Sequence, residues 1–437
     1  MNSDAHVVIR EFGYLLPEMS GVNEGQSIRK LNNKAFKYLQ SLLYDESNVD
    51  DEHKHFLRPA RKQGCEALQV CNYVGVLQTP CGTQIEILPK IHDGDNEGEV
   101  RNVLIGMLRY LRSSYFRESQ NALLHDIKMP LAEVFFRHFL NEVNKLLKKG
   151  IRSDYVTQEN NMSVLKGKLM LPQHIRSNVV MKHRMYIQYD EYLPDRAENR
   201  LIRSALTIIG AASRLAANQR LCRELMFTFD EVPMSQDYKA DFSMCRNDRA
   251  MVHYQHVMEW CQLILNHRSP VSSKGDTNSI SILFPMERIF EDYVAARLKQ
   301  SFPEYQVRSQ STGKSLAEHK GKQVFALRPD LVIGSHGGCL CVADTKWKRI
   351  DQNDRGNKYG ISQSDMYQLY AYARKYNCKR VMLIYPEIVG AFDKALEPFD
   401  FDDEFRLDVV PFPLRASGST DDRIRCIISN VLQDLEP

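Results

Sequence analysis

The sequence lacks the features that mark a secreted, disulfide-bonded or membrane-spanning protein. Its 437 residues include ten cysteines, but these are scattered and form no CxxC pair. Such spacing predicts reduced thiols in a cytoplasmic protein rather than a disulfide framework. No basic flank precedes a long apolar core at the N-terminus, so we expect no signal peptide. Arg214 interrupts the most apolar helical stretch, near Ala205–Ala217, so we expect no membrane span.

A strong excess of charge of either sign is also absent. The formal net charge is +3 at pH 7, so no overall basic surface indicates nucleic-acid binding, although a local basic groove is compatible with it. The hydrophobic content of 43% and the charged content of 26% are ordinary for a globular protein. The length is enough for two or three domains with cores of their own.

Apolar spacing divides the chain into three blocks, and we expect an α/β (α+β) multidomain protein. A β-rich N-terminal domain, a mostly helical middle domain and a C-terminal domain of alternating helices and strands are expected at residues 1–95, 96–270 and 271–437. The clearest boundary is the Ser-, Pro- and Gly-rich stretch Ser269–Ser279.

In the first block we expect a strand at His6–Leu16 and a helix at Ser27–Leu43, with Ser27 as its N-cap. A strand pair is expected within residues 66–91, with a turn at Thr79–Gly82. The short acidic segment Asp93–Glu99 is typical of a linker.

Helical spacing dominates the middle block, and the last block alternates, which predicts an α/β layer fold there. The middle helices are expected at Glu99–Leu111, Leu131–Lys149, Asn199–Ala217 and Ala250–Asn266, with Gly150 at a C-cap position. The last block has expected helices at Met286–Gln300, Ser364–Tyr376 and Asp421–Leu432. Its expected strands are Tyr305–Ser309, Gln323–Ile333, Cys339–Trp347, Arg380–Tyr385 and Leu407–Val410.

Two acids and a lysine border the apolar runs of RPDLVIGSHGGCLCVADTKWK, residues 328–348. Because side chains alternate across a strand, Asp344 and Lys346 share one face with the apolar residues that precede them, and they emerge at its rim. The glycines between the runs fold the first strand back as a hairpin. Asp330, at the start of that strand, can then lie beside Asp344.

Two neighbouring carboxylates repel each other unless a cation lies between them. Mg²⁺, or Mn²⁺ in its place, binds one or two carboxylates and keeps waters and phosphate oxygens as its other ligands. A lysine beside it can orient a water or neutralise charge that develops on a phosphate. The pattern P-D…D-x-K therefore indicates a metal-dependent nuclease site with Asp330, Asp344 and Lys346 as its catalytic residues.

The spacing alone is not specific, because several other segments of the chain fit acid-x-Lys. They are Glu52-His-Lys54, Asp126-Ile-Lys128, Asp237-Tyr-Lys239 and Glu318-His-Lys320. None of these ends an alternating apolar strand that follows a second acid-headed strand. The alternative for the favoured pattern is a surface ion pair at the end of a strand.

Three further residues are candidates for supporting roles. Glu291, on the expected helix Met286–Gln300, is a candidate third metal ligand, and a solvated glutamate is the alternative. Gln368 and Tyr372 are four residues apart on one helix face and could help to hold phosphate or the lysine. Ordinary amphipathic packing with polar tips explains this pair nearly as well.

A competing nucleotide-binding motif is incomplete. Gly313-Lys314-Ser315 looks like the end of a phosphate-binding loop, but Arg308 stands where the loop requires another glycine. We therefore expect a polar turn there.

With these residues in hand, the sequence resembles the McrC family, the nuclease subunits of McrBC-type modification-dependent restriction systems. The similarity follows the order of the family along most of the chain. Its fragments are IREFGYL, YVGVLQTPCGTQIEILPKI, RNVLIGMLRY, LKGKLML, DRAENRLIRSAL, RPDLVI, CVADTKWK, DMYQLYAYA and VMLIYP.

The resemblance implies a C-terminal PD-(D/E)xK endonuclease domain with a mixed central sheet between helices. It assigns metal ligation to Asp330 and Asp344 and the catalytic lysine role to Lys346, whereas Glu291 matches an acid that some members lack. It also implies an McrB-like partner, a hexameric AAA+ GTPase, and double-stranded DNA with modified bases as the substrate. Arg10, Lys90 and the stretch 65–91 are candidates for contact with this ring, and a packed sheet with surface charge is their alternative.

The leading hypothesis is an Mg²⁺-dependent endonuclease subunit that works within a motor complex and stimulates its GTPase. A non-catalytic adaptor that caps and activates the ring through a degenerate nuclease fold is the alternative. A third reading, an NTPase at Gly313–Ser315, predicts nucleotide hydrolysis by the isolated chain. Contact with DNA is expected to be electrostatic, and we expect base recognition to reside in the partner.

Overall fold

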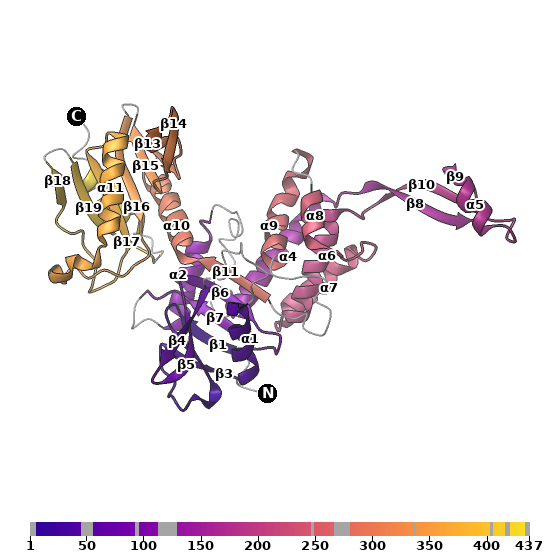
Figure 1. Cartoon of the computed structure of the whole chain (residues 1–437), viewed down its shortest axis with the longest axis horizontal. Helices are drawn as coiled ribbons and strands as arrows, with labels where there is room; N and C mark the ends of the chain where they lie inside the picture. The colour runs from indigo at the N-terminus through magenta and orange to yellow at the C-terminus, as the bar shows by residue number, and fades with distance from the viewer. Residues whose placement is uncertain are drawn as a thin grey trace. The chain divides into compact units, whose positions relative to one another are not determined.

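The computed structural model describes residues 6–44, 56–91, 96–111, 129–245, 249–265, 280–335, 338–402, 405–415 and 420–432. The chain forms two compact units (Figure 1). The first unit combines Met1–Leu77, Thr83–Met129 and Leu283–Pro437, and the second combines Gln78–Gly82 with Pro130–Ile282. The expected mixed α/β class is confirmed, whereas the division into three domains stays a prediction.

Two four-stranded sheets form the N-terminal part of the chain. Their strand orders are β1(His6–Arg10)-β7(Gln84–Leu88)-β6(Tyr73–Gln78)-β11(Ile280–Pro285) and β3(Ile28–Leu31)-β2(Tyr14–Pro17)-β5(Cys65–Val70)-β4(Leu57–Lys62). The helices are α1 (Asn33–Tyr44), α2 (Glu97–Leu108) and a 3-10 turn, η2 (Glu18–Ser20). Buried Ile9, Leu15, Leu39, Leu68 and Ile85 belong to one core that both sheets and α1 share.

The expected strand His6–Leu16 is in fact two strands in different sheets. Phe12 has a left-handed φ of 61° between them, and a Cβ at Gly13 would lie 2.7 Å from Ile9 Cγ1. The chain therefore turns sharply at a residue that tolerates no side chain. Because the alternation of apolar residues continues across this turn, the sequence pattern did not reveal it.

The expected start of the first helix was wrong. Asn32, not Ser27, caps α1, since its Oδ1 accepts a hydrogen bond of 2.8 Å from the backbone N–H of Ala35. Residues 28–31 form β3 instead, pairing with β2 in parallel. An asparagine cap and a serine cap satisfy the same orphan N–H groups, so local sequence allowed both.

The stretch 66–91 holds three strands rather than a pair, because β5 belongs to one sheet and β6 and β7 to the other. The turn at Thr79–Gly82 is confirmed by a 2.9 Å hydrogen bond from Gly82 N–H to Thr79 O. Of the expected linker Asp93–Glu99, residues 97–99 are already in α2, and 93–95 lie outside the described residues. The boundary proposed at Ser269–Ser279 also lies outside them.

The second unit is built on helices. They are α4 (Leu131–Lys149), α6 (Ala197–Ala212), α7 (Ala216–Thr228), α8 (Tyr238–Met244) and α9 (Gln255–Leu265), with the 3-10 turn η5 (Arg249–Tyr254). The helix at Leu131–Lys149 and its terminal Gly150 are confirmed. The expected helix Asn199–Ala217 ends early, because the buried Glu133 carboxylate accepts hydrogen bonds from Ser213 Oγ and from the N–H groups of Arg214 and Leu215.

A long β arm extends from these helices, and the sequence analysis missed it (Figure 1). It consists of β8 (Asp154–Met162), β10 (Met185–Leu193), the short β9 (Lys168–Leu169) and α5 (Leu171–Ser177). Gly167 lies against β10 so closely that a Cβ would be 2.3 Å from Gln188 O. Of the two long strands only Ile187 and Tyr189 are buried, and polar residues fill most other positions, so the apolar pattern that identifies a buried strand is weak.

The C-terminal part is a six-stranded mixed sheet. Its order is β12(Gln306–Ser309)-β15(Leu331–Ser335)-β16(Gly338–Thr345)-β17(Arg380–Pro386)-β19(Phe405–Phe412)-β18(Phe399–Asp402). A separate hairpin joins β13 (Lys314–His319) to β14 (Lys322–Leu327), so the expected strand Gln323–Ile333 is divided between two sheets. The strands β16, β17 and β19 run parallel to one another.

Helices cover this sheet as the alternating pattern predicts. They are α10 (Met286–Ser301), α11 (Gln363–Tyr376) and α12 (Thr420–Leu432), with the 3-10 turn η6 (Arg355–Gly360). Buried Leu369, Tyr372 and Ala373 of α11 share a core with Val342 of β16 and Val381 of β17. Among the described residues, no helix is both long enough and apolar enough to cross a bilayer.

Candidate active site

The two aspartates of the nuclease-like pattern meet at one edge of the six-stranded sheet. Asp330 directly precedes β15, and Leu331 pairs with Ala343, so the antiparallel register brings Asp330 opposite Asp344. Asp330 Oδ2 accepts hydrogen bonds of 2.7 Å from both the N–H and the hydroxyl of Thr345. The side chain of Asp330 is thereby tied to the neighbouring strand at the residue next to Asp344.

Asp344 and Lys346 form a close ion pair in a buried position. The side chain of Asp344 points from β16 toward α11, and the residue is 2% exposed. Lys346 Nζ lies 2.5 Å from Asp344 Oδ2. On the other side, Gln368 Nε2 lies 3.5 Å from Asp344 Oδ1 and donates a 2.8 Å hydrogen bond to the Tyr372 hydroxyl. The structure thus brings Gln368 to Asp344 and Tyr372 to Gln368.

Burial and neighbouring charge make ionisation of Asp344 unfavourable. Burial, followed by the charge of Asp330, raises the pKa of Asp344 to about 6, although Lys346 opposes both. Burial by itself would lower the pKa of Lys346, but Asp344, with Asp365 and Asp330, raises it above its ordinary value. The lysine therefore stays protonated near neutral pH, beside two carboxylates that compete for positive charge.

Asp365 is a site residue that the sequence analysis missed. It is 6% exposed in the first turn of α11, behind the N-cap Ser362. Its Oδ1 lies 4.0 Å from Lys346 Nζ, and its Oδ2 lies 3.6 Å from Lys348 Nζ. The two lysines follow the end of β16, and the backbone N–H of Lys348 donates to Lys346 O at 3.0 Å, so strand alternation gave no signal for their shared partner. No local sequence pattern connected these lysines to Asp365 at the start of α11.

Glu291 lies near the aspartates but does not complete a cluster with them. Its Oε2 is 3.4 Å from Gln310 Nε2, and the backbone N–H of Gln310 donates a 2.9 Å hydrogen bond to Asp330 O. Gln310 therefore bridges Glu291 and the backbone of Asp330. Within the described part of the chain, no group of three or more His, Cys, Asp or Glu side chains is arranged to hold a metal.

The incomplete phosphate-binding loop is part of the β13–β14 hairpin. Lys314 begins β13, and its ammonium donates a 2.7 Å hydrogen bond to Lys375 O and lies 4.7 Å from the centre of the Tyr376 ring. A phosphate-binding loop needs a helix after its lysine, so that helix N–H groups face the phosphate. A strand follows here instead.

A family model for the "McrBC 5-methylcytosine restriction system component" matches residues 68–386, well over half of the chain. The chain belongs to this family. The matched range includes the aspartate pair, Lys346 and α11. No curated protein matches the chain.

Solved structures give a likeness of fold to this McrBC family member. One is a refined half-complex from a tetradecameric assembly of Thermococcus gammatolerans McrB AAA+ hexamers with bound McrC. Its matched chain is 17% identical, with a TM-score of 0.66 over 98% of this chain and 100% of that one. A cryo-EM structure of the Thermococcus gammatolerans McrBC complex is 16% identical, with a TM-score of 0.45 over 71% of this chain and 90% of that one.

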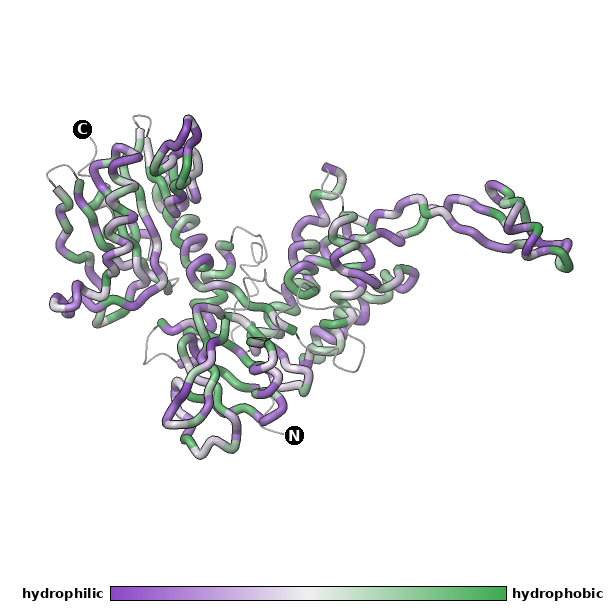
Figure 2. Tube along the Cα trace, in the orientation of Figure 1, coloured by the Kyte–Doolittle hydropathy of each residue, from purple (hydrophilic) through white to green (hydrophobic). Residues whose placement is uncertain are grey.

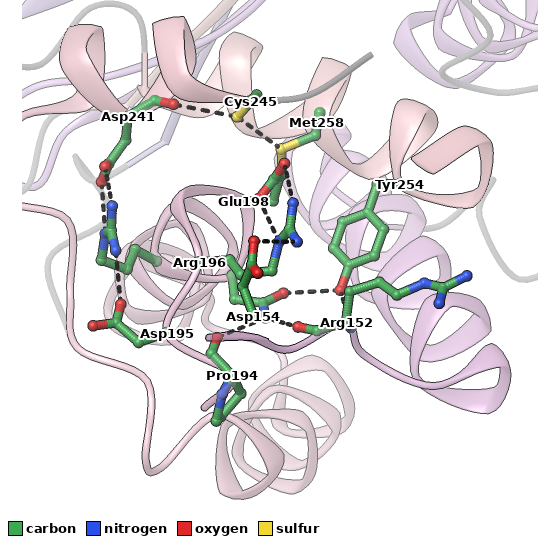
Figure 3. A network of polar contacts seen from close by, with 12 residues as sticks. Arg152, Asp154, Pro194, Asp195, Arg196, Glu198, Asp241, Cys245, Tyr254 and Met258 are labelled. Atoms are coloured by element: carbon green, nitrogen blue, oxygen red, sulfur yellow. Dashed lines mark hydrogen bonds and ion pairs between the residues drawn. The ribbon is translucent and has the colours of Figure 1, made fainter. Parts of the chain in front are cut away.

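A second polar constellation in this McrBC family member lies at the base of the arm (Figure 3). Asn199 Nδ2 donates to Arg152 O at 2.9 Å and to Pro194 O at 2.8 Å. Arg152 lies just before β8, and Pro194 directly follows β10. The Tyr254 hydroxyl donates to Asn199 Oδ1 at 2.9 Å and accepts from Arg152 N–H at 2.8 Å. One buried asparagine thereby bonds to the chain beside each of the two long arm strands and holds the base of the arm to the helices.

Ion pairs surround this asparagine and explain the fragment DRAENR. Arg196 pairs with Asp154 at 3.1 Å and with Glu198 at 3.2 Å. Arg200 pairs with Asp195 at 2.7 Å and with Asp241 at 2.6 Å. Glu198 and Asp241 are buried, whereas Asp154 and Asp195 are partly exposed. Ion pairs of a buried carboxylate fix a geometry rather than add much stability. The segment that follows β10 therefore serves as the anchor of the arm.

The far end of the arm is exposed, apolar and basic. Residues 160–189 hold five lysines and arginines, namely Lys166, Lys168, Arg176, Lys182 and Arg184, and no acid. Val164, Leu171, Ile175, Val179 and Val180 are each more than half exposed. Figure 2 shows hydrophobic segments in this part of the trace. Exposed apolar patches of this kind mark interaction surfaces.

Proposed function

We propose that this chain is the DNA-cleaving subunit of a McrBC-type restriction system, a Mg²⁺-dependent endodeoxyribonuclease with a PD-(D/E)xK site. The observation that carries the proposal is the convergence of Asp330, Asp344 and Lys346 at one sheet edge, with Lys346 Nζ 2.5 Å from Asp344 Oδ2. The family of the chain and the mixed sheet between helices support the same reading.

The donor set fits a small divalent ion bound by two carboxylates. Both hydrogen bonds from Thr345 go to Oδ2 of Asp330, so we assign Oδ1 to the metal. Asp344 is the buried partner, and a cation would offset the repulsion between the two aspartates that raises its pKa. Mg²⁺ or Mn²⁺ would take water and phosphate oxygens as its other ligands. Glu291 is proposed only as an outer group that contacts metal-bound water.

The protein groups would then divide the work of phosphodiester hydrolysis. The bound ion would polarise the phosphate and lower the pKa of a coordinated water. Lys346, held protonated, would lie beside the phosphate and neutralise the charge that develops in the transition state. Asp365 and Gln368 would keep Lys346 and Asp344 aligned, and Tyr372 would hold Gln368 in place.

The partner is proposed to be an AAA+ NTPase ring, because the similar Thermococcus gammatolerans structure contains McrB AAA+ hexamers with bound McrC. This chain would stimulate the GTPase of the ring and leave recognition of modified bases in double-stranded DNA to it. Arg10, Lys90 and the stretch 65–91 stay candidates for ring contact. The exposed apolar and basic end of the arm is a further candidate from its surface chemistry.

Lys346→Ala tests the proposal in the assembled complex of chain and partner. We expect cleavage of methylated DNA to fall by about three orders of magnitude, because metal and ammonium act together on the transition state. Stimulation of the partner's NTP hydrolysis should persist. Lys348→Ala, which removes the half-exposed neighbour, is the matched control and should cleave at more than about a tenth of the parental rate.

A non-catalytic adaptor is the alternative, and the same variant distinguishes it. Undiminished cleavage by the Lys346→Ala complex would show that another chain cuts the DNA. Asp330→Asn adds a readout without DNA, since the parental chain should be stabilised against heat by Mg²⁺ and this variant should not.

A further inference from the structure

A buried carboxyl group of the N-terminal sheet reaches the strand that carries the proposed lysine. Glu11 follows β1 and is 1% exposed. Its Oε2 accepts hydrogen bonds from Trp347 Nε1–H at 3.0 Å and from the backbone N–H of Lys90 at 3.2 Å. The backbone N–H of Glu11 itself donates to Leu88 O at 2.9 Å, so the sheet determines where this carboxyl group lies.

Trp347 is the residue directly after Lys346. Its ring centre lies 5.3 Å from that of Phe290 on α10, and the residue is 9% exposed. The backbone N–H of Lys346 donates to Ile384 O at 2.9 Å, which is the last described ladder bond before the chain leaves the sheet. The strand β16 ends at Thr345, and the backbone N–H of Lys348 donates to Lys346 O at 3.0 Å, so Trp347 lies at the centre of a tight turn. Because Glu11 and Phe290 hold the Trp347 side chain, they constrain the backbone of the adjacent Lys346, whose ammonium lies beside Asp344.

Burying the carboxyl group of Glu11 costs free energy. Its Oε1 has no hydrogen-bond partner among the described residues. Burial raises the pKa of Glu11 to about 8, against the hydrogen bonds from Trp347 and Lys90, and the charge of Glu287 adds to the rise. An apolar side chain would avoid this penalty, so the hydrogen bond to the indole needs a role other than stability.

We propose that Glu11 is a positioning residue for the proposed nuclease site, acting through the Trp347 indole to direct Lys346 toward Asp344. The inference rests on the proposed function, because it assigns the effect to the cleavage step. Misplacement of a catalytic group by about 1 Å can lower a rate by about a hundredfold. A hydrogen bond between the N-terminal sheet and the residue after the lysine is thus enough to govern the rate.

Three variants separate the hydrogen bond from the packing. Glu11→Leu removes the acceptor, Trp347→Phe removes the donor and keeps a ring against Phe290, and Glu11→Gln keeps a carbonyl acceptor. Glu86→Leu is the matched control, a buried acid of the same sheet whose described partners are His6 and Arg101. All are assayed as the full chain with its AAA+ partner, in single-turnover cleavage of methylated DNA.

We expect Glu11→Leu and Trp347→Phe to lower the cleavage rate constant by about tenfold to a hundredfold, with the KM for DNA within about threefold of the parent. Glu11→Gln should restore most of the rate, and Glu86→Leu should cleave within about threefold of the parent. In chains whose second tryptophan is replaced by Trp260→Phe, the emission maximum of Trp347 should shift in Glu11→Leu and not in Glu11→Gln.

Several results would overturn the assignment. They are parental cleavage by Glu11→Leu with shifted Trp347 emission, an equal loss in Glu86→Leu, or a Glu11→Gln variant as slow as Glu11→Leu. If Glu11→Leu does not fold, the pair Trp347→Phe and Glu11→Gln carries the comparison. Failure of the proposed function is distinct, because Lys346→Ala would then cleave normally while Trp347 emission still reports on Glu11.

Discussion

Two single residues, Asp344 and Glu11, bury carboxyl groups at a cost in free energy. Asp344 and Glu11 both carry carboxyl groups that burial leaves hard to ionise. Asp344 pairs with Lys346, and Glu11 accepts a hydrogen bond from the next residue, Trp347. Perturbed carboxyl groups that gather in one place are more typical of functional sites than of cores. The proposed role of Asp344 is to bind the metal, and the proposed role of Glu11 is to hold the Trp347 indole.

The raised pKa of Glu11 predicts a stability that falls with pH. The unfolded chain releases this proton near 4.5, whereas the folded chain holds it to about 8. The contribution of Glu11 to stability is therefore full below pH 4.5 and is lost as pH rises through 8, by on the order of 5 kcal/mol at most. Glu11→Gln removes this dependence, so its urea midpoint should rise relative to the parent between pH 6 and 9, as followed by Trp347 fluorescence in chains that also carry Trp260→Phe.

Glu86 provides the control of opposite sign for this measurement. Burial by itself raises the pKa of Glu86, but His6 and Arg101 bring it below the ordinary value. Its stabilisation is therefore present above 4.5 and is not lost toward high pH. Glu86→Gln should unfold at a lower urea concentration than the parent throughout pH 7 to 9. A midpoint difference for Glu11→Gln that does not change with pH would show that Glu11 is not protonated in the folded chain.

At the scale of elements, the arm combines an exposed end with a closely bonded base. Its two long strands pair over nine residues each, yet Ile187 and Tyr189 are their only buried residues. A two-stranded ribbon is only marginally stable by itself. The hydrogen bonds of Asn199 and the ion pairs of Arg196 and Arg200 therefore determine whether the arm keeps a fixed direction from its helices.

Asn199→Asp tests this role of the arm base. The substitution preserves shape but turns a donor into an oxygen that faces the carbonyl groups of Arg152 and Pro194. The loss of buried hydrogen bonds costs about 1–3 kcal/mol each, so amide exchange in β8 and β10 should quicken by about tenfold or more. Hydrogen exchange measured by mass spectrometry reads these strands separately from α4.

Asn161→Ala is the control at the other end of the arm. Asn161 exchanges hydrogen bonds of 2.8 and 2.9 Å with Asn178, away from the base. Its loss should quicken exchange near the end of the arm and leave residues 154–157 unchanged. Equal exchange in the parent and in Asn199→Asp would mean that other contacts anchor the arm.

At the scale of the whole molecule, one chain carries one proposed cleavage centre. The described residues contain a single hairpin that joins the acid pair to a lysine at a sheet edge. If each centre cuts one strand of DNA, a double-strand break needs two copies of this chain in one assembly.

Mixed assemblies of parental and Lys346→Ala chains test the requirement for two copies. We expect assemblies with one of each to convert supercoiled methylated plasmid to open circles rather than to linear DNA, because one strand stays uncut. Gel separation of the plasmid forms, with size analysis of the complex on DNA, measures the outcome. Linear product at the parental rate from mixed assemblies would show that one centre cuts both strands.

The sequence by itself predicted the C-terminal elements closely. Helices expected at Met286–Gln300 and Ser364–Tyr376 lie within one residue of α10 and α11, since amphipathic spacing over several turns is a strong local signal. The hairpin and its rim residues followed from strand alternation around a glycine-rich turn. The family could be identified from short fragments in order along the chain.

Only the tertiary structure decided which distant residues meet. Asp365, Glu11 and the anchor of the arm are contacts between segments far apart in sequence, and no local pattern connects them. The arm escaped prediction because its two long strands bury only Ile187 and Tyr189, so polar residues dominate their pattern. Periodicity records what an element buries, whereas the position of a carboxyl group against a lysine or an indole depends on how separate sheets and helices pack.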